Sequence, residues 1–409
     1  MWFQEKKYAW YLLGALWLIA LISTIPRFVM AFYQGQIAED LDTSRGFVSF
    51  AWSLNLLITA LCLPVGGWLV DRYGPKRILM AGRIIGVIAA AVTYFSAQHA
   101  FFFLLGYGIL FGLTGISATT EFSLLFYWFK HKRGTANTIL RSASPLGLAL
   151  ISPIFVANRD WLSWSDAFLL TSILGLLLSL PLIQLVVKDP SREPAEAVSG
   201  KRRKTATEIM AEWKETVSSP IMFAVVMALF VCGFNMGTVE MNLVAIHDHA
   251  AVPVETIGLA LSLLGLMDVA GSVFFGILLD RYSRTKILAT LYVLRTIGFL
   301  LLLLSLPVSP LVFSILFGAT YVGVIPGSLL VASEWKKESG AQTGSLLLVH
   351  SLGGIAGSLL GGVTYDLTGN YQLLIGLNLG LCVLAAGLFV FGATMSRRTA
   401  NRETAKASL

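Results

Sequence analysis

Residues 66–80 read GGWLVDRYGPKRILM, and residues 275–289 read FGILLDRYSRTKILA. When the two stretches are aligned, Asp280 matches Asp71 and Arg281 matches Arg72. Each copy is a short polar segment between two long apolar runs. Because the same unit recurs in the two parts of the chain, the sequence predicts two structurally similar halves.

The composition predicts that most of the chain lies in a membrane. Of its 409 residues 56% are hydrophobic and 13% are charged, whereas soluble proteins carry about 25% charged residues. Many apolar runs exceed the ~20 residues that a helix needs to cross a bilayer. The runs are continuous rather than alternating, which favours helices over the strands of a barrel. We therefore expect an all-α integral membrane protein.

Counting the apolar runs predicts twelve membrane-spanning helices, six in each pseudo-symmetric half. The first run is too long for a signal-peptide core and has no small-residue cleavage site nearby, so we expect it to be retained. The spans are expected at 8–33, 46–70, 78–97, 101–128, 134–157, 166–187, 220–246, 255–279, 287–306, 309–331, 341–364 and 371–394. This predicts an N-terminal half at 1–187, a central loop at 188–219, a C-terminal half at 220–396 and a tail at 397–409.

The positions of the basic residues predict the orientation. Of the 30 lysines and arginines, 24 fall in segments on the side of the amino terminus, and only Arg45 and Arg159 fall in loops on the other side. Basic loops remain in the cytoplasm, so both termini are expected there. The net charge of +7 then reflects topology and contact with anionic lipid rather than nucleic acid. Short loops favour a prokaryotic inner membrane, and we expect a monomer.

Other classes of function find few residues to support them. The three cysteines, Cys62, Cys232 and Cys382, all fall in predicted spans and have no metal-binding spacing. The sequence has no nucleotide-binding glycine loop with lysine and no nucleophile elbow. We therefore expect no enzymatic activity, no cofactor and no metal. A membrane sensor would carry a long soluble domain, which is not seen.

The repeated stretch resembles the loop signature of the major facilitator superfamily. The first copy has its full form, Gly-x-x-x-Asp-Arg-x-Gly-x-x-Arg, and the second has Ser283 where a glycine is expected. In that family the loop latches helices together on the cytoplasmic side in one conformation. The resemblance implies this latch role for Gly67, Asp71, Arg72, Arg77, Asp280 and Arg281.

Three further stretches resemble the monocarboxylate transporters and their bacterial oxalate/formate relatives. They are IPRFVMAFY at 25–33, FKHKRGTANTILRSASPLGLA at 129–149 and GGIAGSLLGGVTYDLTGNY at 353–371. In the monocarboxylate transporters, span 8 carries Asp-x-x-x-Arg, whose arginine holds the substrate carboxylate. Here Asp268 is kept and Ser272 stands in place of the arginine. The resemblance implies that an anion anchor must come from another helix.

Charged residues inside predicted spans are functional candidates by default. Arg27 in span 1 and Glu240 in span 7 can face each other across the family's cavity, as an outer gate, an anion anchor with its counter-ion, or a fixed structural pair. Glu121 and Arg141 each lie ~12 Å inside the cytoplasmic face. They could form a structural ion pair or part of a substrate site.

Four other side chains in the spans have a structural or a functional role to be expected. We expect Arg83 and Arg295 to be structural, bonded to carbonyls or extended towards headgroups. Asp268, alone in an apolar run, is either a proton-coupling group or a permanently protonated acid bonded to a neighbour, because an unpaired carboxylate is costly in hydrocarbon. His350 in span 11 either handles protons or packs.

These observations predict a secondary active transporter for a small organic anion, taken to be a monocarboxylate, coupled to protons. Alternating access would come from rocking of the two halves about a midplane site. Substrate contacts are expected from Arg27, Arg141, Asn235 and Tyr321, and proton or counter-ion roles from Asp268, Glu240, Glu121 and His350. The alternative is a proton-driven exporter of drugs or of cationic or zwitterionic metabolites, because such antiporters share the glycines and Pro145 of span 5.

Overall fold

The computed structural model describes residues 6–96, 99–158, 161–189, 218–335 and 340–407. Within these ranges the regular elements are helices, and twelve of them are long and apolar enough to cross a membrane. Each agrees with its predicted span to within about one helical turn; the largest difference is at span 11, which was expected to end at 364 and ends at Thr368. The all-α, twelve-span prediction is confirmed.

The first half contains six spans, most of them built from several helical pieces. Span 1 consists of α1 (Lys7–Ile22) and α2 (Ile25–Phe32), followed by the short α3 (Gln34–Asp40). Spans 2 and 3 are α4 (Arg45–Tyr73) and α5 (Pro75–Phe95). The other three are α6 (Ala100–Phe103), η2 (Leu104–Leu110), α7 (Phe111–Leu113), η3 (Thr114–Ser117) and α8 (Thr120–Trp128); α9 (Arg133–Arg141) and α10 (Ala143–Ala157); and α11 (Trp164–Leu174), η4 (Gly175–Ser179) and α12 (Leu180–Val186).

The second half has longer, mostly uninterrupted helices. They are α14 (Pro220–His249), α15 (Val254–Arg281), α16 (Arg284–Leu304), α17 (Ser309–Thr320), α18 (Val324–Trp335), α19 (Gly340–Thr368) and α20 (Gln372–Ala407). The predicted central loop, 188–219, lies mostly outside the described residues. The helix α20 continues beyond the expected end of span 12, through most of the predicted tail.

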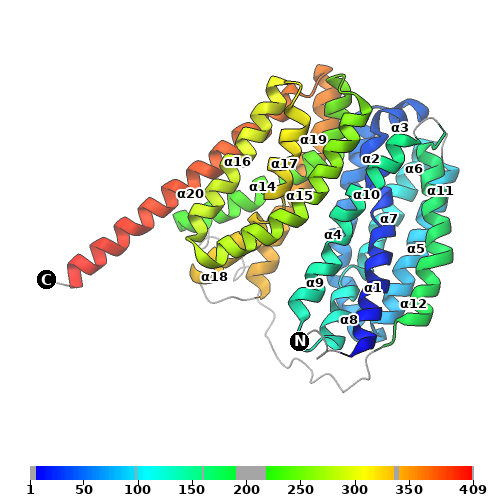
Figure 1. The fold of residues 1–409 in the computed structure, drawn as a ribbon, viewed down its shortest axis with the longest axis horizontal. Coiled ribbons are helices and arrows are strands. Elements are labelled where there is room, and N and C mark those ends of the chain that lie inside the picture. Colours follow the sequence, from blue (N-terminus) through cyan, green and yellow to red (C-terminus); the bar gives the residue numbers. More distant parts are fainter. Residues whose placement is uncertain (1–5, 97–98, 159–160, 190–217, 336–339, 408–409) are drawn as a thin grey trace.

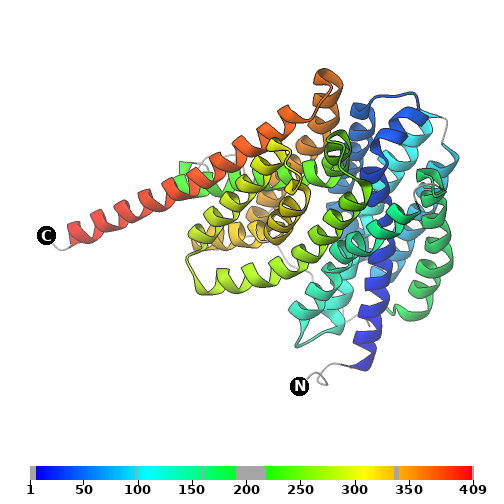
Figure 2. The same ribbon diagram turned by 45° about the horizontal axis from the view of Figure 1, so that its top comes forward.

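The two halves lie side by side, as Figures 1 and 2 show from two directions. They meet through α4 against α19, α10 against α15 and α2 against α14. We call the end of the bundle that holds Arg45 and Tyr371 the closed end. The opposite end, where α15 terminates at Arg281 and where the chain begins, is called the open end.

Hydrogen bonds join the halves near the closed end. Arg45 Nη1 donates to the Tyr371 hydroxyl at 2.9 Å, and the Gly46 N–H donates to Asp366 Oδ2 at 2.8 Å. Arg45 also lies 4.2 Å from the centre of the Tyr365 ring. Burial raises the pKa of Tyr371 to about 12, so the hydroxyl stays neutral near pH 7. These contacts hold the halves together through polar groups.

Glycines determine how closely α14 and α19 pack. A Cβ at Gly237 would collide with the carbonyl oxygen of Gly354, and one at Gly357 would collide with the carbonyl oxygen of Phe234. Van der Waals contact between backbones is a main source of helix association in a membrane, where lipid offers no hydrophobic drive. The glycine ladder therefore holds α14 and α19 together as one rigid unit.

We predict that Gly237→Ala destabilises the protein, because the new methyl group forces these two backbones apart. Overpacking of this kind costs about 1–3 kcal/mol. The melting temperature of the detergent-purified protein should therefore fall by several degrees. Gly380→Ala is the matched control, because a Cβ at Gly380 in α20 meets no atom within 4 Å. An equal response of the two variants would contradict this packing account.

Candidate functional site

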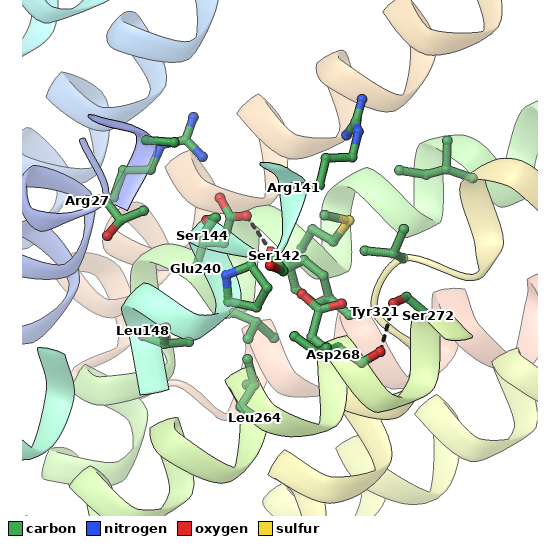
Figure 3. A pocket seen from close by; sticks show the side chains of 18 of the residues that line it. Arg27, Arg141, Ser142, Ser144, Leu148, Glu240, Leu264, Asp268, Ser272 and Tyr321 are labelled. Carbon is green, nitrogen blue, oxygen red and sulfur yellow. Dashed lines mark hydrogen bonds between the residues drawn. The ribbon is translucent and has the colours of Figure 1, made fainter. Parts of the chain in front are cut away.

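A cavity of about 810 Å³ lies between the halves and is lined by both of them. Figure 3 shows that charged side chains reach it from several helices. Its polar lining includes Arg27, Glu121, Arg141, Ser142, Ser144, Glu240, Asp268, Ser272, Asp280 and Tyr321. The lining reaches Asp280, next to the end of α15, so the cavity extends to the open end of the bundle.

The N-terminal half contributes two arginines to this cavity. Arg27 on α2 is exposed, and within the described parts of the chain it makes no hydrogen bond or ion pair. Arg141, the last residue of α9, is also exposed, and its guanidinium lies 5.0 Å from the centre of the Phe122 ring. Both guanidinium groups therefore keep donors available for an anionic ligand.

Glu121 pairs with Arg83, so the Glu121–Arg141 ion pair, one of the two roles that the sequence left open, is not formed. Arg83 Nη2 lies 2.7 Å from Glu121 Oε1, and its Nη1 donates to the Ser23 hydroxyl. Both α5 and α9 pack against α8, but the guanidinium of Arg141 lies over the Phe122 ring rather than beside Glu121. Arg83 is thus bound to a carboxylate, not to carbonyls or headgroups as the sequence suggested.

The C-terminal half contributes acids and a tyrosine. Tyr321 donates to Glu240 Oε1, and this contact is drawn in Figure 3. The Arg27–Glu240 pair allowed by the sequence is not formed among the described residues; the partner of Glu240 there is the Tyr321 hydroxyl. Asp268 is only 7% exposed and makes no hydrogen bond to any described group. Ser272 donates to the Val269 carbonyl at 2.8 Å, within its own helix.

A break in span 10 places Tyr321. The helix α17 ends at Thr320 and α18 begins at Val324. Arg295 on α16 binds the freed carbonyl oxygens of Thr320 and Tyr321, at 2.9 and 3.0 Å. Carbonyl binding was one of the two roles expected for Arg295, and the hydrogen bonds confirm it.

Two of the residues predicted to contact substrate or protons lie outside the cavity lining. Asn235 is fully buried, donates to Asn378 Oδ1 at 2.8 Å and accepts from Arg295 at 3.3 Å. It therefore joins α14, α16 and α20 rather than facing a ligand. His350 lies where α14 and α19 pack, and its Nε2 has no partner among the described groups.

The residues of the repeated stretch lie at the open end. Asp71, Arg72, Arg77, Asp280 and Arg281 are all exposed there, and a Cβ at Gly67 would meet nothing within 4 Å. Arg72 lies over the rings of Trp68 and Tyr73, at 5.4 and 5.5 Å. The five charged residues lie at the ends of α4 and α15 and in the first turn of α5, and among them Asp280 lines the cavity.

One contact at this end was missed from the sequence. Asp189 Oδ1 accepts the Lys76 N–H at 2.9 Å, and Lys76 Nζ donates to the Gln184 carbonyl at 2.8 Å. A carboxylate at the first turn of a helix is favoured there. The contact was not predicted because Asp189 is far from α5 in the sequence, at the start of the expected central loop.

The model of the Major Facilitator Superfamily matches residues 16–249 and 225–408. The chain belongs to this family. It is 27% identical over 399 residues to the MFS-type transporter YcxA of Bacillus subtilis (strain 168), with 94% of each chain covered. The matched family describes transporters, so the protein is a membrane transporter rather than an enzyme.

Two other relatives bear names that specify substrates. The oxalate:formate antiporter of Oxalobacter formigenes is 24% identical over 289 residues, covering 69% of this chain and 66% of that protein. Monocarboxylate transporter 3 of Rattus norvegicus is 24% identical over 405 residues, covering 94% and 80%. The crystal structure of the nucleoside transporter NupG superposes with a TM-score of 0.74 at 13% identity, covering 95% of this chain and 99% of that one, which shows the shared fold.

We predict that the Arg83–Glu121 pair stabilises the N-terminal half. Arg83→Met alone leaves an unpaired carboxylate, and Glu121→Leu alone leaves an unpaired guanidinium. Each should cost about 3 kcal/mol, the lower end for a broken buried pair. The double variant should recover most of this loss, which thermal unfolding of the four proteins in detergent would measure. Additive losses would show that the two side chains do not act as a pair.

Proposed function

We propose that the protein is a secondary active transporter that carries a small organic anion with one carboxylate group, coupled to protons, by alternating access. One observation carries this proposal. Two arginines with no carboxylate partner line one wall of the cavity, and Glu240 and Asp268 line the opposite wall. An anion binds between them when the acids are protonated.

The lining also supports a single carboxylate on an apolar body. Ser142 and Ser144 lie beside Arg141, at one side of the cavity. Leu148 and Leu264 face the interior from α10 and α15, and most of the remaining lining is apolar. A dianion would leave its second charged group against these side chains. The name of monocarboxylate transporter 3 supports the same class, whereas the name of the oxalate:formate antiporter supports only the wider class of small carboxylates, because oxalate is a dianion.

Protons would be carried by the acids of the C-terminal half. Asp268 is buried, and a carboxylate without a hydrogen-bonded partner is costly in such a place. Protonation removes this cost, and it also removes the repulsion between the acid and an incoming substrate anion. Glu240, held by Tyr321, is the second acid that an entering anion approaches. Proton binding and anion binding thus favour each other.

The conformation corresponds to one state of the proposed cycle. With the basic loops in the cytoplasm, the open end of the bundle is cytoplasmic, and the structure is an inward-facing state. Return to the outward-facing state requires breaking the Arg45–Tyr371 contact at the closed end. It also brings the ends of α4 and α15 together, where Asp71 and Asp280 could act as latches.

An exporter of cationic compounds fits the cavity less well. Arg83 neutralises Glu121, and the Tyr321 hydroxyl donates to Glu240 without neutralising it, so Glu240 and Asp268 are the acids that a cation could approach. A cation would meet the two unpaired arginines on the other wall. Thermal-shift measurements of the purified protein with carboxylates, amino acids and amines at two pH values separate the two functions. Stabilisation by amines alone would favour the exporter.

We predict that Arg27→Gln reduces carboxylate uptake into proteoliposomes at least tenfold. The reason is the loss of a charge-assisted hydrogen bond, worth roughly 1.5–3 kcal/mol. Arg27→Lys keeps the charge and should retain part of the uptake. Both variants should fold normally, because Arg27 makes no bond to another described group. Undiminished uptake by Arg27→Gln would remove Arg27 from the binding site.

We predict that Asp268→Asn uncouples transport from protons. The amide imitates the protonated acid, so exchange of labelled for unlabelled carboxylate across the membrane should continue. Uphill accumulation driven by a pH gradient should fall to background. Both are measured in the same proteoliposomes, so lost exchange would indicate a substrate-binding role instead. Retained accumulation would show that another group carries the proton.

A further inference from the structure

The cavity is apolar between its charged residues and the closed end. Arg27, Glu240 and Asp268 line it from spans 1, 7 and 8. On the closed-end side of these three positions, each lining residue that the same spans contribute is apolar. These residues are Phe28, Ala31, Leu243, Val244, Leu261 and Leu264. Together with Trp52 and Leu148 they form what we call the apolar chamber.

Trp52 and Leu148 complete the chamber from spans 2 and 5. Of α4, which is described in full, Trp52 alone lines the cavity. It lies seven residues after Arg45 and therefore about 10 Å from the closed end, by the rise of a helix. Leu148 is the last lining residue of span 5 in the direction of the closed end. In Figure 3, Leu148 and Leu264 lie on the side of the view away from Arg141.

Aromatic packing fixes the walls of the apolar chamber. The Trp52 side chain is 2% exposed, and its ring centre lies 6.3 Å from that of Tyr107, with the two planes 29° apart. The Phe28 ring centre lies 5.0 Å from that of Phe155. Close packing of this kind leaves the rings little room to move, so the chamber has a defined size.

A buried polar network closes the chamber behind Trp52. Gln34 Nε2 donates to the Ser49 hydroxyl at 3.0 Å and to Asn242 Oδ1 at 3.2 Å, which joins the two halves. All three side chains are buried. The indole N–H of Trp52 is also buried, and it has no partner among the described groups. The chamber is thus a blind end that offers a ligand neither a charge nor an accessible side-chain donor.

A carboxylate in such a chamber would lose its hydration without gaining a partner, whereas an apolar group is stabilised by leaving water. We propose that the substrate is an alkyl or aryl monocarboxylate whose body fills the apolar chamber, with its carboxylate facing the arginines and the open end. Trp52 then limits the length of the body and determines specificity. This inference names the substrate class of the proposed function and rests on it.

The dissociation constants of the unbranched acids from acetate to octanoate test this inference on the purified protein by calorimetry. Affinity should rise about fourfold for each added methylene that is fully buried. The rise should stop at a limiting length, where the body reaches Trp52. Affinities that stay equal or fall from acetate to hexanoate would overturn the inference.

Variants of Trp52 test the end wall. Trp52→Phe loses no hydrogen bond, because the indole N–H has no partner among the described groups, and it should move the limiting length to a longer acid. Trp52→Leu should move it further. Val273→Ala is the control, because Val273 lines the cavity on the open-end side of Asp268 and should leave the limiting length unchanged. An unchanged limiting length in the Trp52 variants would contradict the role of Trp52.

A comparison on the wild-type protein needs no variant. The affinity for 5-hydroxypentanoate should be at least tenfold below that for pentanoate, because the chamber would bury the added hydroxyl group without a partner. Equal affinities would overturn the inference. Tight binding of acetate with weak binding of longer acids would overturn it and leave the proposed function intact. Wild-type protein that binds none of these acids would contradict the proposed function itself.

Discussion

The cost of a charge in hydrocarbon is the constraint on which the rest of this structure depends. Within the spans, Arg83 is paired with Glu121, Arg295 is bound to backbone carbonyls, Arg27 is exposed to the cavity, and Asp268 is buried in the cavity wall. The paired and capped charges stabilise the halves. The charges left for a ligand are therefore the ones in the cavity, and the proposed anion site rests on them.

Interruptions of the helices place these groups. Span 1 is broken between α1 and α2, span 5 at Ser142 and span 10 after Thr320, and each break adjoins a cavity residue. Freed backbone groups inside a membrane must find partners. Ser23 and Thr24 bind carbonyls in span 1, and Arg295 does so in span 10. Irregular backbone thus occurs where side chains must point into the cavity.

Periodicity and composition were enough to predict the twelve spans and the repeated stretch, because hydrophobic length is a local property. The partners of the membrane charges were not predictable in the same way. Depth along the helix placed Glu121 level with Arg141, but depth says nothing of rotation about the helix axis. Arg83 on α5 reaches Glu121 because of that rotation, and Asn235 faces α16 rather than the cavity for the same reason. Rotation is fixed by packing between helices, which a single sequence does not show.

The two kinds of contact in the molecule explain how such halves could rock. Within the C-terminal half, glycines bring the backbones of α14 and α19 into contact. Separating these two helices would cost a large loss of packing. Near the closed end, side-chain hydrogen bonds join the halves, such as Arg45 to Tyr371 and Ser53 to Ser358. Water can replace the partners of such polar groups, so opening there costs far less than unpacking a half. Glycines also bring the two halves close together, since a Cβ at Gly265 would collide with the Pro145 carbonyl oxygen and one at Gly362 with the Arg45 carbonyl oxygen. Rocking of the halves would therefore have to separate close backbone contacts as well as hydrogen bonds.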